Sequence, residues 1–281
     1  MTWKIVSDSG CDFQKIKDLA VATNFERVPL TIQVGNEIFT DDAELDIDEM
    51  MEKMYATSTA SKSACPSPDD YLKSFAGADN LFVVTITGTL SGSNNSAQLA
   101  KKLYQEEHPN VNIHVIDSLS AGGEIDLIVH KLNHLIGQGL SFEEVVQAIT
   151  DYQKKTKLLF VLSKVDNLVK NGRLSKLLGT VVGLLNIRMV GEASSQGTLE
   201  LLQKARGHKK SLTAAFEELL KAGYAGGEII IAHRNNTKFC QQFSELVKEK
   251  YPKASITIIP TSGLCSFYAE EGGLLMGYEI E

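Results

Sequence analysis

Three short apolar runs each end in a turn rich in Ser, Thr and Asp, and each turn is followed by a helical pattern. The runs cover residues 4–6, 81–85 and 112–116. Strands that alternate with helices in this way favour a parallel sheet with helices on both of its faces. Open α/β sheets bind ligands at the carboxyl ends of their strands, where such polar turns lie. The first half of the chain is therefore predicted to be an α/β domain with a ligand site at that edge.

The second half follows a different pattern, in which strands succeed one another between fewer helices. We expect strands at 158–162, 186–192, 198–205, 228–232, 255–259 and 274–279, and helices at 209–222 and 239–250. This order indicates an α+β domain with a mixed or antiparallel sheet. A chain of 281 residues is long enough for two domains. We therefore predict an N-terminal α/β domain, residues 1–155, and a C-terminal α+β domain, residues 156–281.

The remaining elements of the first half are expected from local patterns. Gly35-Asn36 between two alternating segments indicates a hairpin over residues 27–40. Asp12 is expected to cap a helix around Phe13–Ala22, and the run Thr57–Ser67 is expected to be a stiff loop. Further helices are predicted at 46–55, 69–75, 124–137 and 142–154.

The loop Thr85–Ala97 has the composition of an anion site. It holds Gly88 and Gly92, which let a ligand approach the backbone, and six Ser and Thr hydroxyls. Free N–H groups at the start of the following helix favour an anionic oxygen. This combination suits a carboxylate or a phosphate, although the loop matches no nucleotide-binding motif. An equally good interpretation is that Ser93 or Asn94 simply caps the helix.

Composition excludes several classes of protein. The chain carries 28 Lys and Arg against 35 Asp and Glu, a net charge of −7, and has no basic run, so nucleic acid is a poor candidate partner. Its four cysteines lie far apart, which indicates neither a zinc ribbon nor a disulfide framework. The N-terminal sequence lacks the features of a signal peptide, and no apolar run approaches the ~18 residues of a membrane span. We expect a soluble, cytoplasmic protein.

A metal site is not expected. His130 and His134 are four residues apart on one predicted helix, a spacing that can bind a metal ion. No glutamate follows the first histidine and no third ligand is evident, so both are expected to lie on an ordinary helix face.

Five short motifs occur in order along the chain. They are Ser7-Asp8-Ser9 with Asp12, Ser63-Ala64-Cys65-Pro66-Ser67, Leu90-Ser91-Gly92-Ser93 with Ser96-Ala97, Asp117-Ser118, and Asn171-Gly172-Arg173-Leu174-Ser175. With these motifs the chain resembles, over nearly its whole length, the DegV family of bacterial fatty-acid-binding proteins that serve a fatty acid kinase.

The resemblance implies two α/β domains that hold an acyl chain between them. Hydroxyls of the first domain would bind the carboxylate, and the matching residues here are Ser63 and Ser91, with Gly92 and Ser93 as further donors. The family also has a histidine near the C-terminus, in a Gly-x-His-x-Gly-Pro-Gly segment. Cys265 stands in the corresponding place here. We therefore expect any contact from the second domain at Cys265. The departure leaves three alternatives open: an altered ligand choice, weakened coupling to the kinase, or a paralogue with another ligand.

The resemblance also implies that the chain performs no catalysis and needs no cofactor beyond its bound fatty acid. It would present the carboxylate to a separate kinase that makes an acyl phosphate for phospholipid synthesis, with transient contact with a membrane surface. Lys170, Arg173 and Lys176 are candidate docking residues for that kinase. The apolar runs 158–162 and 177–185 are candidate tunnel walls, although a core role explains them equally well.

Two other functions stay open on the residues alone. A serine hydrolase would use Ser91 with His233 and an aspartate such as Asp117, all near predicted strand ends. No nucleophile elbow is present, however, because Gly88–Gly92 has one residue too many before the serine. A binder of another small anion, such as a phosphate ester, also fits the loop, whereas a long apolar cavity would argue against it.

Overall fold

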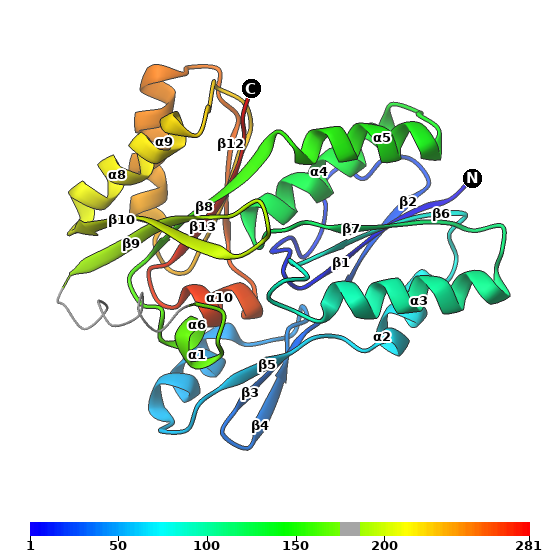
Figure 1. Ribbon diagram of the computed structural model, residues 1–281, viewed down its shortest axis with the longest axis horizontal. Coiled ribbons are helices and arrows are strands. Elements are labelled where there is room, and N and C mark those ends of the chain that lie inside the picture. Colours follow the sequence, from blue (N-terminus) through cyan, green and yellow to red (C-terminus); the bar gives the residue numbers. More distant parts are fainter. Residues whose placement is uncertain (175–185) are drawn as a thin grey trace.

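The computed structural model describes residues 1–174 and 186–281 and arranges them in two lobes (Figure 1). The first lobe is built on a parallel sheet of order β2-β1-β6-β7. Its strands are β1 (Trp3–Asp8), β2 (Thr23–Val28), β6 (Asn80–Thr85) and β7 (Asn112–Asp117), and its helices are α2 (Pro68–Phe75), α3 (Ser93–Glu107), α4 (Gly123–Gly137) and α5 (Phe142–Gln153). The predicted class of the first half is confirmed.

Helices cover both faces of this sheet. Along β6, Phe82 and Val84 pack in one cluster with α4, whereas Leu81 and Val83 pack in another with α2 and α3. A strand buried on both faces has a continuous apolar run rather than an alternating one. This explains why the run at 81–84 is recognisable in the sequence.

A small antiparallel sheet of order β4-β3-β5 projects from the first lobe. It consists of β3 (Thr31–Val34), β4 (Glu37–Thr40) and β5 (Lys62–Ala64), and α1 (Ile47–Ala56) packs on it. The core of this sheet also contains Phe267, which comes from the C-terminal part of the chain. The small sheet therefore joins the two lobes.

The second lobe contains a six-stranded sheet of order β10-β9-β8-β13-β11-β12. The strands are β8 (Thr156–Leu162), β9 (Ile187–Ala193), β10 (Leu199–Arg206), β11 (Ile229–His233), β12 (Ile256–Pro260) and β13 (Leu274–Glu279), and the helices are α6 (Asp166–Lys170), α8 (His208–Lys221), α9 (Thr237–Lys250) and α10 (Gly263–Ala269). Among the strands that the structure describes in this sheet, β11 and β12 pair in parallel and the other pairs are antiparallel, so the predicted mixed sheet is confirmed. Helices α8 and α9 cover one face, and the other face is turned toward the first lobe (Figure 1).

Helix α4 connects the two lobes. It packs against β13 and β11 of the second sheet, and at its start the backbones of Gly123 and Gly277 meet without a side chain between them. The next residue, Glu124, is buried and accepts a hydrogen bond from the Thr156 hydroxyl at 2.8 Å. Burial raises the pKa of Glu124 from 4.5 to about 7.

The division of the chain into two domains at residue 155 stays a prediction.

Replacing Glu124 with glutamine is expected to stabilise the chain above pH 7. The folded-state pKa exceeds the unfolded value, so the glutamate lowers stability progressively as the pH rises from about 4.5 to about 7. At 1.36 kcal/mol per pH unit, this destabilisation is at most about 3 kcal/mol near pH 8 and vanishes at low pH. Thermal unfolding of E124Q and wild type across this range should show a difference that grows with pH. A difference independent of pH would contradict the prediction.

Two local predictions are wrong, and a third is right only in part. Residues Phe13–Ala22 form turns rather than a helix, and Asp12 directs its carboxylate to Ser262 instead of capping one. The hairpin turned by Gly35-Asn36 is confirmed as β3 and β4, but it begins at Thr31 rather than at residue 27, because Pro29, which has no N–H to donate, separates β2 from β3. Part of the expected loop Thr57–Ser67 is the short strand β5.

Within the described ranges, no helix is long and apolar enough to cross a membrane.

Candidate functional site

A cavity of about 300 Å³ lies between the two lobes. Along β8, the side chains of Leu158, Phe160 and Leu162 face it, whereas Leu159 and Val161 face α8 and α9. Its apolar lining consists of Leu30, Ala64, Ile86, Leu90, Ala121, Leu158, Phe160, Leu162, Leu168, Ala193, Leu199, Leu264, Ala269 and Leu275. The run 158–162 thus supplies both cavity wall and core. The other candidate wall, 177–185, lies outside the described residues.

Polar groups gather in one part of the cavity wall. Ser63 and Cys65 come from β5 and the residue after it, and a Cβ atom on Gly92 would lie only 3.0 Å from the Cys65 sulfur. The Ser63 hydroxyl lies 2.7 Å from the hydroxyl of Tyr268 on α10. The structure therefore brings together Ser63, Ser91 and Gly92, three of the four residues predicted for the carboxylate site.

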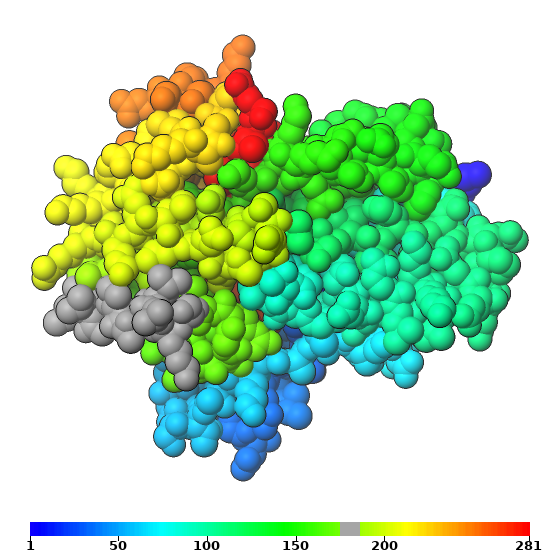
Figure 2. Space-filling view, viewed as in Figure 1, coloured from blue at the N-terminus to red at the C-terminus, as the bar shows by residue number. Residues whose placement is uncertain are grey.

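The loop after β6 is held by residues of the second lobe. The Thr87 hydroxyl donates to the Gly197 carbonyl at 3.0 Å, and the Thr89 hydroxyl donates to the Gln196 carbonyl at 2.6 Å. Figure 2 shows the turn between β9 and β10 seated against this loop. Arg173 donates from Nε to the Leu90 carbonyl at 3.2 Å. The predicted anion loop, which belongs to the first lobe, is thus held in place by the second lobe.

Ser93 occupies a different position from the other three predicted donors. It is fully buried at the start of α3, and its hydroxyl bonds Asp8 and lies 2.7 Å from the Tyr71 hydroxyl. Ser93 is not one of the described residues that line the cavity. The N-cap of α3 is Gly92, so the predicted cap by Ser93 or Asn94 is wrong; the Ser91 hydroxyl, however, accepts a hydrogen bond from the Ser93 N–H at 3.3 Å. A role for Ser93 in binding stays a prediction.

Cys265 lies in the cavity wall on α10 but is turned toward the backbone. Its thiol donates to the Gly10 carbonyl, with 3.6 Å between sulfur and oxygen, and burial raises the pKa of this thiol well above its usual value. It is therefore a neutral, weak hydrogen-bond donor. Tyr268, which the sequence analysis missed, reaches the polar part of the cavity from the same helix one turn later.

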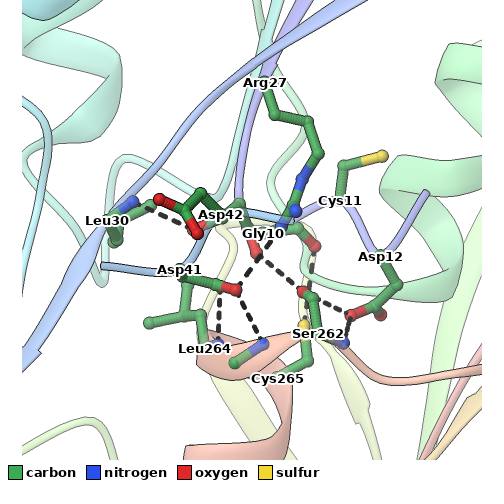
Figure 3. A network of polar contacts seen from close by, with 12 residues as sticks. Gly10, Cys11, Asp12, Arg27, Leu30, Asp41, Asp42, Ser262, Leu264 and Cys265 are labelled. Carbon is green, nitrogen blue, oxygen red and sulfur yellow. Dashed lines mark hydrogen bonds and ion pairs between the residues drawn. The ribbon is translucent and has the colours of Figure 1, made fainter. Parts of the chain in front are cut away.

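Two buried carboxylates of the first lobe hold the start of α10 (Figure 3). Asp12 accepts hydrogen bonds from the Ser262 N–H at 2.7 Å and the Ser262 hydroxyl at 2.9 Å. Asp41 accepts from the N–H groups of Gly263 at 2.8 Å and Leu264 at 2.7 Å. Burial raises the pKa of Asp12 above its usual value. These bonds satisfy N–H groups at the start of α10 that have no partner inside the helix.

The residues of the hydrolase alternative are not joined to one another. Asp117 accepts hydrogen bonds from the N–H groups of Gly88 and Leu119, and His233 accepts from the Asn236 N–H through Nδ1. In the part of the chain that the structure describes, no hydrogen bond links Ser91, His233 and Asp117. The geometry gives no support to a catalytic triad.

The histidine pair is likewise occupied by ordinary contacts. His130 pairs with Glu228 at 3.0 Å, and the Nε2 atom of His134 bonds Gln138 at 2.9 Å. Over residues 1–174 and 186–281, no group of His, Cys, Asp and Glu could hold a metal ion. Of the candidate docking residues, Lys170 is exposed at the end of α6, and Lys176 lies outside the described residues.

The fold and the site define the class of protein. It is a two-lobed α/β protein with an apolar cavity between the lobes, and hydroxyls and an arginine lie in one part of the cavity wall. A profile of the DegV family, described as uncharacterised proteins, matches residues 2–279. The chain therefore belongs to the DegV family, as the five motifs predicted. A DegV domain-containing protein of Streptococcus gordonii is 84% identical over 280 residues, which cover all of both chains.

Solved structures of relatives have the same fold. The Streptococcus pneumoniae fatty acid kinase (Fak) B3 protein, loaded with linoleic acid, is 74% identical over the full length of both chains, with a TM-score of 0.99. A DegV family protein of Eubacterium eligens, loaded with heptadecanoic acid, is 39% identical over both full chains, with a TM-score of 0.96. A DegV family protein of Ruminococcus gnavus, refined with vaccenic acid, is 34% identical over 98% of this chain and 99% of its own, with a TM-score of 0.90.

Proposed function

We propose that this chain binds a long-chain fatty acid, buries the acyl chain between its lobes and presents the carboxylate to a separate fatty acid kinase. The observation that carries the proposal is the apolar cavity between the lobes, with hydroxyl groups gathered in one part of its wall. Support comes from three relatives, 34% to 74% identical, whose structures hold fatty acids.

The acyl chain supplies most of the affinity. Burying each methylene is worth about 0.8 kcal/mol, so a chain of about 14 to 18 carbons gains roughly 10–13 kcal/mol relative to water. Each hydrogen bond to the charged head adds only about 1.5–3 kcal/mol. The bilayer offers the chain similar burial, so the protein must bury the acyl chain in its apolar cavity about as well, and the polar residues serve mainly to orient the head.

The head-group contacts suit presentation rather than chemistry. Ser63, Ser91 and the Gly92 N–H are neutral donors, and a carboxylate that accepts their hydrogen bonds keeps a lone pair for attack on a phosphoryl group. Catalysis then lies in the kinase, which converts the carboxylate to an acyl phosphate. Arg173 is tied to the Leu90 and Asn171 carbonyls, at 3.2 and 2.6 Å, which makes it a structural bridge as well as a candidate docking residue with Lys170 and Lys176.

With this function the protein would work in the cytoplasm and bind transiently to the membrane surface, where it would take up and release fatty acids. The direct test is native mass spectrometry of the chain purified from a bacterial host, followed by denaturing extraction. We expect one fatty acid per chain, with no other cofactor. An empty protein that also takes up no added fatty acid would overturn the proposal.

Replacing Ser91 with alanine should release a bound fatty acid faster. Losing one hydrogen bond to a carboxylate costs about 1.5–3 kcal/mol, which corresponds to roughly a 10- to 150-fold change. The rate of transfer from protein to lipid vesicles measures this, and S58A, at an exposed serine of the Thr57–Ser67 segment, is the matched control. Ester hydrolysis by wild type that disappears in S91A would instead favour the hydrolase.

A further inference from the structure

We propose that Tyr268 is the contact from the second lobe that positions the ligand carboxylate, acting through the hydroxyl of Ser63. The proposal rests on the fatty acid function proposed above and assigns to Tyr268 the place that the sequence analysis gave to Cys265. Tyr268 is then a positioning residue for the head group.

The geometry of the pair carries the argument. The Tyr268 and Ser63 hydroxyl oxygens are 2.7 Å apart, and both residues line the cavity. They come from opposite lobes and are 205 positions apart in the chain, so the hydrogen bond links the two lobes at the polar part of the cavity wall. Ser63 is paired with Ile32 in the small sheet, which fixes its backbone.

The two hydroxyls carry one proton each, which defines the direction of the hydrogen bonds. When Ser63 donates to a carboxylate, its oxygen is left to accept, and Tyr268 is the donor at hydrogen-bonding distance. A hydroxyl that accepts one hydrogen bond is polarised and donates a stronger one, so Tyr268 strengthens the bond from Ser63 to the ligand. Burial raises the pKa of Tyr268, which keeps the phenol protonated for this role.

The surroundings of Tyr268 favour the same role. The guanidinium carbon of Arg173 lies 6.0 Å from the centre of the tyrosine ring, and its positive charge makes the phenol a better donor. Helix α10 is fixed at its start by Asp12 and Asp41, so the tyrosine is presented from a rigid element. Cys265 lacks these features, because its thiol is directed to the Gly10 carbonyl.

The test is a double-mutant cycle on the release of linoleic acid, the fatty acid bound by the pneumococcal relative. Release to lipid vesicles is measured for wild type, Y268F, S63A and the double variant. We expect Y268F to release the acid about five- to tenfold faster and S63A about tenfold or more. Because Tyr268 acts through Ser63, the double variant should be no faster than S63A. Y104F, which removes a hydroxyl on α3 outside the cavity lining, should match wild type.

A second ligand separates positioning from a general structural effect. Linoleyl alcohol has the same chain without a carboxylate, so its release should accelerate only about two- to threefold in Y268F, since hydrogen bonds to a charged acceptor are roughly twice as strong. Equal acceleration for acid and alcohol, additive effects in the cycle, or release of the acid from Y268F at the wild-type rate would each overturn the proposal. Wild type that binds no linoleic acid would instead overturn the proposed function.

Discussion

Replacing Ala193 with tryptophan is expected to reduce the affinity for a long-chain fatty acid by about 100-fold. Ala193 ends β9 and shares the cavity face of that strand with Gly191 and Met189. An indole at this position is driven into the cavity rather than into solvent by the burial of its own apolar surface. If it displaces about four methylenes of the ligand, the loss is roughly 3 kcal/mol, which is about a 100-fold weaker dissociation constant.

The measurement is fatty acid content after purification, together with the dissociation constant for added linoleic acid. The matched control is A43W, which places the same side chain on an exposed position of the first lobe. Shorter acids should regain affinity in A193W, because they need less of the cavity. Wild-type affinity in A193W would show that the acyl chain is bound elsewhere.

The parallel sheet of the first lobe could be predicted because its signals are local. The inner strands β1 and β6 each carry an apolar run that is buried on both faces and followed by a polar turn. The edge strand β2 lacks such a run and was not predicted. The segment after β1 broke this pattern. Its helical appearance at 13–22 is overridden by tertiary contacts, in which the Asp12 carboxylate and the backbone N–H groups of Asp12 and Phe13 bond Ser262 and Asp126 far away in the chain.

The site was only partly predictable, because its residues meet across long separations. The motifs identified the loops that carry Ser63, Ser91 and Gly92, which is as far as a local pattern extends. Tyr268 was missed because α10 was not predicted. Without a helix, the three-residue spacing between Cys265 and Tyr268 does not indicate that the two side chains lie on one face. Residues three apart on a helix share a face, so a helix at 263–269 would have made Tyr268 a candidate beside Cys265.

The contact between the lobes had no signal in the sequence at all. Gly123 and Gly277 look like ordinary glycines near a helix start and within a strand, and neither needs a positive φ angle. Their importance is steric, because a Cβ atom on Gly277 would lie 2.2 Å from the carbonyl oxygen of Gly123 and 2.4 Å from the N atom of Glu124. Only the folded arrangement of α4 on β13 creates this requirement.

Replacing Gly277 with alanine is accordingly expected to cause the largest loss of stability among single changes at the interface. The atoms that meet the new methyl group belong to the backbone, so no side chain can rotate away, and α4 must move off the sheet. Overpacking of this kind costs about 4 kcal/mol at the upper end of the usual range. For a chain of this size the melting temperature should fall by about 10 °C.

The control is G137A, at the other end of the same helix, where a Cβ atom would meet only Ala20 at an ordinary distance of 3.6 Å. Its melting temperature should stay within about 2 °C of wild type, because no atom has to move. Since the cavity is walled by both lobes, G277A should also lose its fatty acid during purification even at temperatures where it remains folded. A G277A chain with the wild-type melting temperature and a full complement of ligand would mean that α4 does not fix the lobes relative to each other.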